Sequence, residues 1–191
     1  MTARQRLIDS TVALIRRRGV GSASVSDILE DSGLARRTLY LNFPKGKPEL
    51  VAAATTWAAS TITDAMRSQL NEGDPAKLVR TFARTWEKVL TDSGFDAGCP
   101  IVAATLARAE APEAADAAAA AFTEWVRLAA EVNEEAGLPR QDAMGLATTM
   151  IAAIEGAVIM ALAARSTDPI RRTARDVAAL IEMKVAAAQG A

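Results

Sequence analysis

Apolar residues recur along most of this chain at helical spacing, and no stretch alternates between apolar and polar residues with the period of a strand. Gly and Pro stand almost only at the ends of these segments, and alanine is abundant between them, which favours helix. Polar residues or Pro begin the segments, as helix capping requires. We therefore predict an all-α chain of about nine helices, at 3–18, 24–32, 35–43, 48–70, 75–93, 100–109, 112–136, 139–164 and 168–188.

The segment from residue 24 to residue 50 has the layout of a helix-turn-helix. Ser24 is followed three residues later by Asp27, which is the spacing of a capping box. Gly33 suits the left-handed residue that closes a helix. In the next helix the apolar residues fall four apart and can pack inward, so the opposite face is free to enter a major groove of DNA. The inward positions are Ala35, Leu39 and Phe43, and the opposite face carries Arg36, Arg37 and Tyr40.

Three pieces of this segment, SVSDIL, SGLARRTLY and LNFPKGKPEL, resemble the DNA-binding domain of TetR-type transcriptional regulators. The pattern TLYxxFxxK, with one extra residue in the FPKGK loop, is more restrictive than a generic helix-turn-helix. Gly98-Cys99-Pro100 also resembles an element of a TetR subgroup related to lincomycin-resistance regulators. The resemblance implies a DNA-binding domain at 1–47, a ligand-binding and dimerisation domain at 48–191, and a homodimeric repressor of a palindromic operator in double-stranded DNA.

The resemblance also implies roles for single residues of the first domain. Arg36 and Arg37 would reach base edges, for which arginine suits guanine, and Leu41 could touch a thymine methyl group. One departure is Ala35, because the family normally has Ser or Thr there and Ala cannot cap a helix; helix entry should be weaker, or one bond to a phosphate should be missing. The residues expected at phosphates or at the flanking strand are Ser24, Ser26, Thr38, Tyr40, Asn42 and Lys47.

In TetR-like proteins the second domain encloses a pocket for a small molecule, here expected to be apolar or aromatic. Any one candidate taken alone is better explained as part of the core, whereas the set as a whole favours a cavity among them. Glu155 and Thr148 are the polar side chains that stand out in the apolar helix at 139–164. Cys99 is either a buried small hydrophobe or a redox-active thiol. The expected ligand-binding residues are Trp57, Met66, Phe82, Trp86, Cys99, Phe122, Trp125, Met150 and Glu155.

The helix at 139–164 is apolar nearly all round, which indicates burial on more than one side. We expect it to form a dimer interface together with the last helix, and a twofold dimer matches a palindromic operator. The residues expected at this interface are Ile151, Ile154, Val158, Leu162, Val177, Leu180 and Ile181.

Charge separates the two ends of the chain. Residues 1–50 hold nine Lys or Arg and five Asp or Glu, giving +4, so the remainder carries −5 to reach the net −1. A basic head on an acidic body is typical of a DNA-binding domain joined to a domain with another role, although a solvated charge run would look the same. A single cysteine, and a sequence without a leader-like start, favour the cytoplasm.

The sequence gives less support to other classes of function. The chain has no histidine, no metal-ligand cluster and no phosphate-binding glycine loop, so we expect no enzyme, no metal and no cofactor. A helical interaction protein that has lost DNA binding stays open as an alternative, and Ala35 and Leu41 are the residues that favour it. The sequence does not specify the ligand, the operator, the target genes, or repression as against activation.

Overall fold

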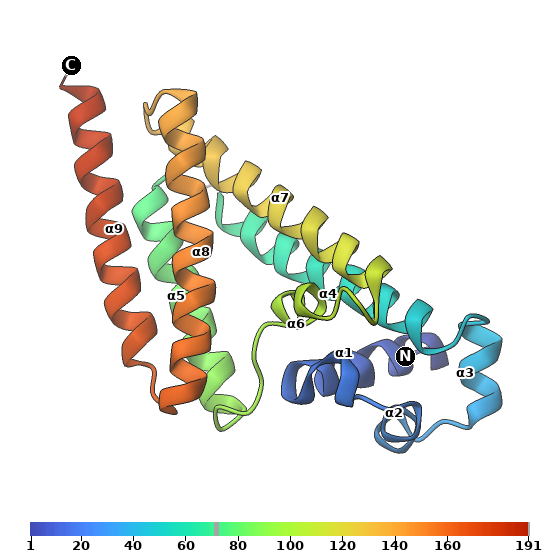
Figure 1. Cartoon of the computed structure of the whole chain (residues 1–191). Coiled ribbons are helices and arrows are strands. Elements are labelled where there is room, and N and C mark those ends of the chain that lie inside the picture. Colours follow the sequence, from blue (N-terminus) through green and yellow to red (C-terminus); the bar gives the residue numbers. More distant parts are fainter. Residues whose placement is uncertain (71–72, 191) are drawn as a thin grey trace. The chain divides into compact units, whose positions relative to one another are not determined.

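The computed structural model describes residues 1–70 and 73–190, and in this part of the chain every regular element is an α-helix. The all-α prediction is confirmed (Figure 1). The helices of the described residues are α1 (Ala3–Ser22), α2 (Val25–Ser32), α3 (Arg36–Asn42), α4 (Lys47–Leu70), α5 (Pro75–Asp92), α6 (Pro100–Leu106), α7 (Pro112–Glu135), α8 (Arg140–Ala164) and α9 (Asp168–Gln189).

The helix ends follow local capping chemistry. Thr2 accepts a hydrogen bond from the backbone N–H of Gln5 at 3.2 Å, but the Gln5 side chain donates to Asp9, so the reciprocal half of a capping box is not formed. α1 runs past its expected end and is interrupted at Gly19, where φ is +75°. Asp74 caps α5 through its side chain, and α6 ends at Leu106, earlier than predicted. Residues 71 and 72, which follow the predicted end of α4, lie outside the described residues.

The chain divides into two compact units, which we describe separately. The first contains Met1–Ile62 and Ala97–Ala121, and the second contains Thr63–Asp96 and Phe122–Ala191. α4 and α7 therefore each contribute residues to both units. These packing units do not coincide with the expected division at residues 47 and 48, which concerns function and stays a prediction.

In the first unit, α1 packs against α2, α3 and α6. Leu7 and Ile15 of α1 are fully buried, as are Leu39 and Phe43 of the following helices. A polar tie reinforces the contact between α1 and the start of α6: Arg16 donates from Nε to the Gly98 carbonyl at 2.9 Å, and Gly98 N–H donates to the Arg16 carbonyl at 3.0 Å. This packing fixes the orientation of the helix-turn-helix on α1.

In the second unit, α5, α8 and α9 lie side by side, with α9 against both of the others (Figure 1). An ion pair between Arg171 of α9 and Glu87 of α5 spans 3.1 Å. α8 is the one helix of the described residues that is long and apolar enough to cross a membrane, with a mean hydropathy of 1.9 over its most apolar window. Half of that window is buried inside the chain, and core helices of soluble proteins have the same composition.

Candidate nucleic-acid interface and effector cavity

The first helix of the helix-turn-helix has the predicted capping box. Ser24 Oγ accepts from the Asp27 backbone N–H at 3.1 Å, and the Asp27 carboxylate accepts from the Ser24 backbone N–H at 3.0 Å. The Ser24 hydroxyl also donates to this carboxylate, and that bond is the main reason why the pKa of Asp27 lies below its usual value. Gly33 closes the helix in the left-handed conformation, with φ +64° and ψ +32°. The start, the end and the turn are therefore as predicted.

The second helix, α3, separates a buried face from an exposed one. Leu39 and Phe43 are fully buried, whereas Ala35 is exposed, so the prediction that Ala35 faces inward is wrong. Ala35 occupies the N-cap position and makes no side-chain capping hydrogen bond, as expected. The exposed face of this helix carries Arg36, Arg37, Tyr40 and Leu41.

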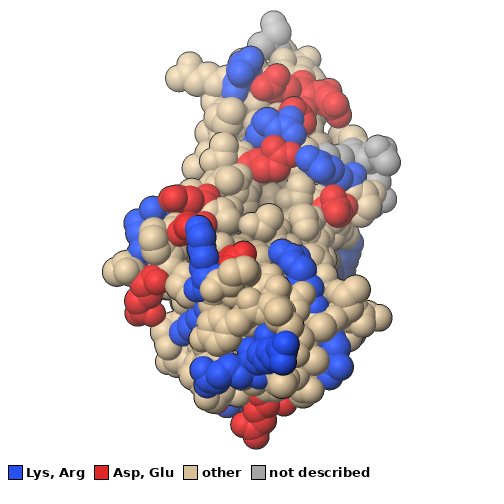
Figure 2. Space-filling view, turned by 90° about the vertical axis from the view of Figure 1, so that its right-hand side faces the viewer, with Lys and Arg blue, Asp and Glu red and all other residues tan. Residues whose placement is uncertain are grey.

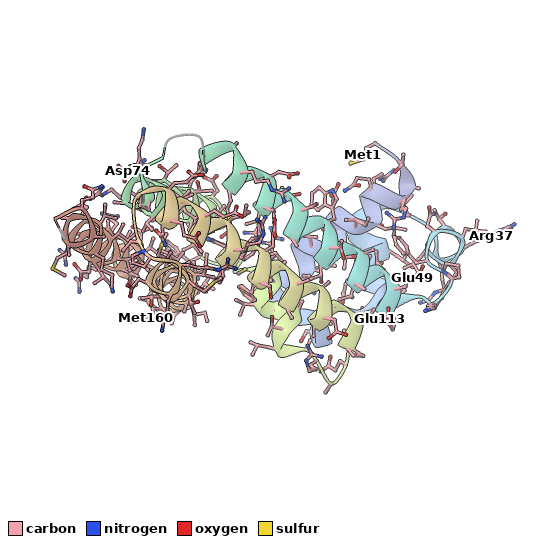
Figure 3. All side chains as sticks on the ribbon, turned by 90° about the horizontal axis from the view of Figure 1, so that it is seen from above. Met1, Arg37, Glu49, Asp74, Glu113 and Met160 are labelled. Atoms are coloured by element: carbon pink, nitrogen blue, oxygen red, sulfur yellow. The ribbon has the colours of Figure 1, made fainter. Side chains whose placement is uncertain are left out.

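The exposed face is open to a large partner. Leu41 is 71 % exposed and Tyr40 is 45 % exposed. Figure 3 shows the Arg37 side chain extending away from the ribbon. In Figure 2 several Lys and Arg side chains lie on the lower part of the face shown, with Asp and Glu side chains among them. The arginine guanidinium groups and the tyrosine hydroxyl can donate hydrogen bonds to phosphates and base edges, and the leucine side chain can contact methyl groups of bases.

Most of the other residues expected to contact DNA are half-buried or already hydrogen-bonded within the chain. Ser24 and Ser26 are exposed at the start of α2, but the Ser24 hydroxyl is already part of the capping box. Thr38 and Asn42 are half-buried, and the Asn42 amide donates to the Thr38 carbonyl at 2.8 Å. Lys47 is half-buried at the start of α4, and its Nζ lies 3.4 Å from the Gly21 carbonyl. An ammonium has three donors, so Lys47 keeps capacity for a phosphate.

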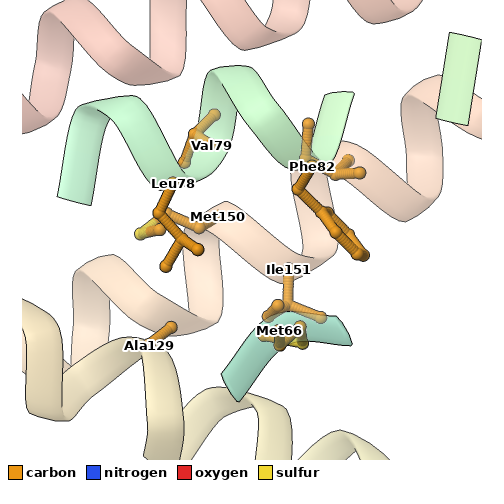
Figure 4. Close-up of a pocket in the computed structure, with 8 residues that line it drawn as sticks. Met66, Leu78, Val79, Phe82, Ala129, Met150 and Ile151 are labelled. Carbon is orange, nitrogen blue, oxygen red and sulfur yellow. The ribbon is translucent and has the colours of Figure 1, made fainter. Parts of the chain in front are cut away.

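The second unit contains a small cavity with an entirely apolar lining (Figure 4). Its volume is about 20 Å³, enough for roughly one water molecule. A molecule the size of an aromatic ring therefore has to displace side chains. Met66 and Met150 are the flexible members of the lining, because an unbranched thioether side chain adapts easily. The lining consists of Met66 of α4, Leu78, Val79 and Phe82 of α5, Ala129 of α7, and Met150, Ile151 and Ile154 of α8.

Three of the predicted ligand-binding residues, Met66, Phe82 and Met150, line this cavity. Trp86 packs edge-to-face on Phe82, with ring centroids 6.5 Å apart. Sequence reasoning did not assign Leu78, Val79 or Ala129 to the pocket. The helical spacing of the apolar residues of α5 was the available signal for the first two.

The remaining candidates lie elsewhere. Trp125 is buried and donates from Nε1 to Thr63 Oγ1 at 2.9 Å, and Phe122 packs edge-to-face on it with ring centroids 5.3 Å apart. Glu155 is buried in α8 but does not line the cavity, and Thr148 is exposed. Trp57 and Cys99 belong to the first unit, where Trp57 is 38 % exposed and Cys99 is buried. Burial fits Cys99 as a small hydrophobe.

The residues expected at the dimer interface mostly pack inside the chain. Ile151, Ile154, Val158, Val177 and Ile181 are buried, two of them against the cavity, and Leu162 and Leu180 are half-buried. The apolar surface that α8 and α9 expose consists instead of Met144, Ile159, Met160 and Met183, between 39 % and 65 % exposed. A helix that is apolar all round gives no signal in sequence for which side faces its own chain. Five of the seven residues are buried within their own chain, and the dimer interface itself stays a prediction.

Comparison with known proteins agrees with this architecture. Residues 7–54 match the model of bacterial regulatory proteins of the tetR family, and residues 75–176 match the C-terminal domain of LmrA/YxaF-like transcriptional regulators. An uncharacterized HTH-type transcriptional regulator of Mycobacterium tuberculosis is 30 % identical over 175 residues, which cover 87 % of this chain and 88 % of that protein. The HTH-type transcriptional regulator LmrA of Bacillus subtilis is 22 % identical over 173 residues, covering 88 % and 90 %.

Solved structures share the fold. A regulatory protein TetR from Rhodobacter sphaeroides superposes with a TM-score of 0.84 at 22 % identity, covering 92 % of this chain and 97 % of that one. A TetR transcriptional regulator from Legionella pneumophila gives a TM-score of 0.81 at 17 % identity, covering 93 % and 96 %. The chain is thus a helix-turn-helix transcriptional regulator. It belongs to the TetR family, with a C-terminal domain of the LmrA/YxaF-like type.

Proposed function

We propose that this regulator is a cytoplasmic repressor that binds a palindromic operator as a homodimer and leaves it when an apolar small molecule occupies the cavity of the second unit. The observation that carries the proposal is the exposed face of α3, which presents Arg36, Arg37, Tyr40 and Leu41 on a helix fixed by its buried side. Burial of Leu39 and Phe43 leaves that face as the side that can enter a groove.

A second copy of the chain is the best partner for the exposed apolar surface of α8 and α9. Two neighbouring helices carry four large apolar side chains that a lone chain would leave in water. A twofold dimer presents two copies of α3, and these must stand about 34–36 Å apart to enter successive major grooves. The twofold symmetry of the dimer therefore matches the twofold symmetry of a palindromic operator.

Helix α4 supports coupling between the cavity and DNA. It runs without a break from Lys47, expected at a phosphate, to the last turns that include Met66 of the cavity lining. A ligand that pushes Met66 aside acts on the same helix that carries Lys47. Such a ligand shifts the equilibrium only if it binds the DNA-free conformation more tightly, and operator DNA must then weaken ligand binding by the same factor.

DNA binding is tested by fluorescence anisotropy with a labelled duplex from the protein's own upstream region, and with a random duplex of equal length as control. We expect preference for the upstream duplex and a steep loss of affinity with salt, because counterions are released at each neutralised phosphate. Failure to bind either duplex would favour the alternative, a helical interaction protein that has lost DNA binding.

Ligand response is tested with the intrinsic tryptophan fluorescence of the chain, in which Trp86, one of three tryptophans, packs on the cavity residue Phe82. Small lipophilic compounds are titrated with and without operator duplex present. An inducer should bind more weakly by the same factor by which it weakens DNA binding. A compound that binds equally well in both cases does not act through this coupling.

A further inference from the structure

The side chain of Asn133, near the end of α7, is fully buried beside the cavity residue Met150. Its Nδ2 donates to the carbonyl oxygen of Ala143 at 3.1 Å and lies 3.8 Å from the sulfur of Met150. The Ala143 carbonyl can only accept a hydrogen bond, so this contact fixes which end of the amide is nitrogen and which is oxygen.

The other end of this amide, Oδ1, is buried, and no group among the described residues donates a hydrogen bond to it. A buried acceptor without a donor costs about 1–3 kcal/mol, so such an atom calls for a physical reason. Oδ1 is bonded to the same carbon as Nδ2 and therefore lies close to the Met150 thioether. Met150 contacts this amide and also lines the cavity, so it is the side chain that connects the two.

We infer that the effector of this regulator is an apolar molecule carrying one hydrogen-bond donor, a hydroxyl or an N–H, which displaces the Met150 side chain and donates to Oδ1 of Asn133. The inference rests on the proposed use of the cavity as the effector site. The cavity has to enlarge for any ring-sized ligand, and Met150 is a lining residue that can change rotamer without breaking a strong polar contact.

A hydrogen bond from the ligand to Asn133 Oδ1 predicts an order of affinities among small aromatic ligands. Without a partner for the hydroxyl, phenol would bind more weakly than toluene, because a buried unpaired hydroxyl is costly. With Asn133 Oδ1 as the partner, phenol recovers that cost and also satisfies the buried acceptor. Anisole carries an ether oxygen on the ring but has no hydrogen-bond donor, so it separates the effect of hydrogen-bond donation from that of polarity in general.

The test uses the full-length protein with ¹³C-methyl-labelled methionine and NMR titrations of toluene, phenol and anisole. The methyl signals of Met66 and Met150 report on the cavity, and that of Met1, which is 89 % exposed and belongs to the first unit, serves as the internal control. We expect phenol to bind at least as tightly as toluene and more tightly than anisole, with the largest shifts at the cavity methionines. Tighter binding of toluene than of phenol overturns the inference while leaving the effector cavity intact.

Two variants test the role of the Asn133 amide separately from that of the Met150 side chain. Asn133→Leu should lower phenol affinity by about tenfold relative to toluene, whereas Met150→Leu keeps the amide and should keep the preference for phenol. Unchanged selectivity in Asn133→Leu contradicts the inference. Because that variant also loses the bond to Ala143, the ligand comparison in the parent protein decides the matter if it does not fold. If none of the three compounds shifts Met66 or Met150, the effector cavity itself is wrong, and this inference with it.

Discussion

The ring of Tyr40 lies against Gly46, so that a Cβ atom added at residue 46 would stand 3.2 Å from Cε1 of Tyr40. Gly46 has φ of +72°, in the left-handed region that favours glycine. The loop between α3 and α4 therefore needs glycine for two reasons, its backbone conformation and the space that Tyr40 occupies. The loop glycine of the FPKGK sequence thus sets the orientation of an aromatic side chain on the face expected to contact DNA.

Replacing this glycine should affect both stability and DNA binding. Gly46→Ala places a Cβ in a left-handed conformation, which costs about 1–2 kcal/mol, and it also pushes the Tyr40 ring from its position. Chemical denaturation should show the loss of stability, and anisotropy titrations should show weaker binding of the operator duplex.

Gly94→Ala is the control, because Gly94 has φ of +61° but no atom within 4 Å of an added Cβ. It should lose comparable stability and keep its DNA affinity. If the two variants bind DNA equally well, the contact between Tyr40 and Gly46 has no role at the interface.

The exposed arginines of α3 should carry most of the sequence readout. Arg36→Ala combined with Arg37→Ala should cost about 1–3 kcal/mol of binding free energy for each good hydrogen-bonded pair with a base that is removed, and should flatten the preference for the operator over random duplex. Competition titrations measure both quantities. Arg84→Ala removes an exposed arginine of α5 and should change neither. Full specificity in the double variant would mean that α3 does not read the groove.

Much of the fold could be predicted from sequence because its signals are local. The capping box of Ser24 and Asp27 and the closing Gly33 each act within one turn of helix, and each is found as predicted. The exposed face of α3 could likewise be predicted in large part, since Leu39 and Phe43 recur at a fixed spacing. Ala35 breaks this rule because the helix only begins at Arg36.

The cavity and the apolar surface could not be predicted in the same way, because they depend on which helices pack together. Met66, Phe82 and Met150 come from three helices, and only tertiary packing joins them with Leu78 and Ala129. α8 shows the limit most clearly. Its buried Val158 and its exposed Ile159 are adjacent β-branched residues, and composition does not distinguish their two environments.

Stability should depend on pH through Glu124. Arg127 donates two hydrogen bonds to this carboxylate, at 2.8 and 2.9 Å, and Arg67 donates another at 2.7 Å. These bonds, chiefly those of Arg127, lower the pKa of Glu124 from 4.5 to about 2. A lowered pKa in the folded state means that the contribution is fully present above the unfolded value of 4.5 and is lost as pH falls towards 2.

The measurement compares the parent protein with Glu124→Gln by chemical denaturation between pH 7 and pH 3. The group is close to solvent, so the difference at pH 7 should be about 1 kcal/mol or less, and it should shrink at pH 3. High salt should also reduce it, because exposed charges are screened. A difference that stays constant over this pH range would show that the arginine contacts do not stabilise the ionised carboxylate.

The proposed dimer surface is tested by adjacent residues of α8 that differ in burial. Ile159 is 53 % and Met160 is 62 % exposed, whereas Val158 is 1 % exposed. Ile159→Glu or Met160→Glu should keep helical circular dichroism and the melting transition of a folded chain, but should run as a monomer in size-exclusion chromatography with light scattering. A charge at these positions would be desolvated without a partner only in the dimer.

Val158→Glu places the charge inside the chain and should destabilise the fold itself by about 3 kcal/mol or more. Leu106→Glu is the matched control, since Leu106 is 82 % exposed in the first unit and lies outside the proposed surface. That variant should remain a dimer. A parent protein that is monomeric at micromolar concentration, or an Ile159→Glu variant that remains dimeric, would show that α8 does not join the two copies through this face. The two copies of α3 would then need another contact to reach the spacing that a palindrome requires.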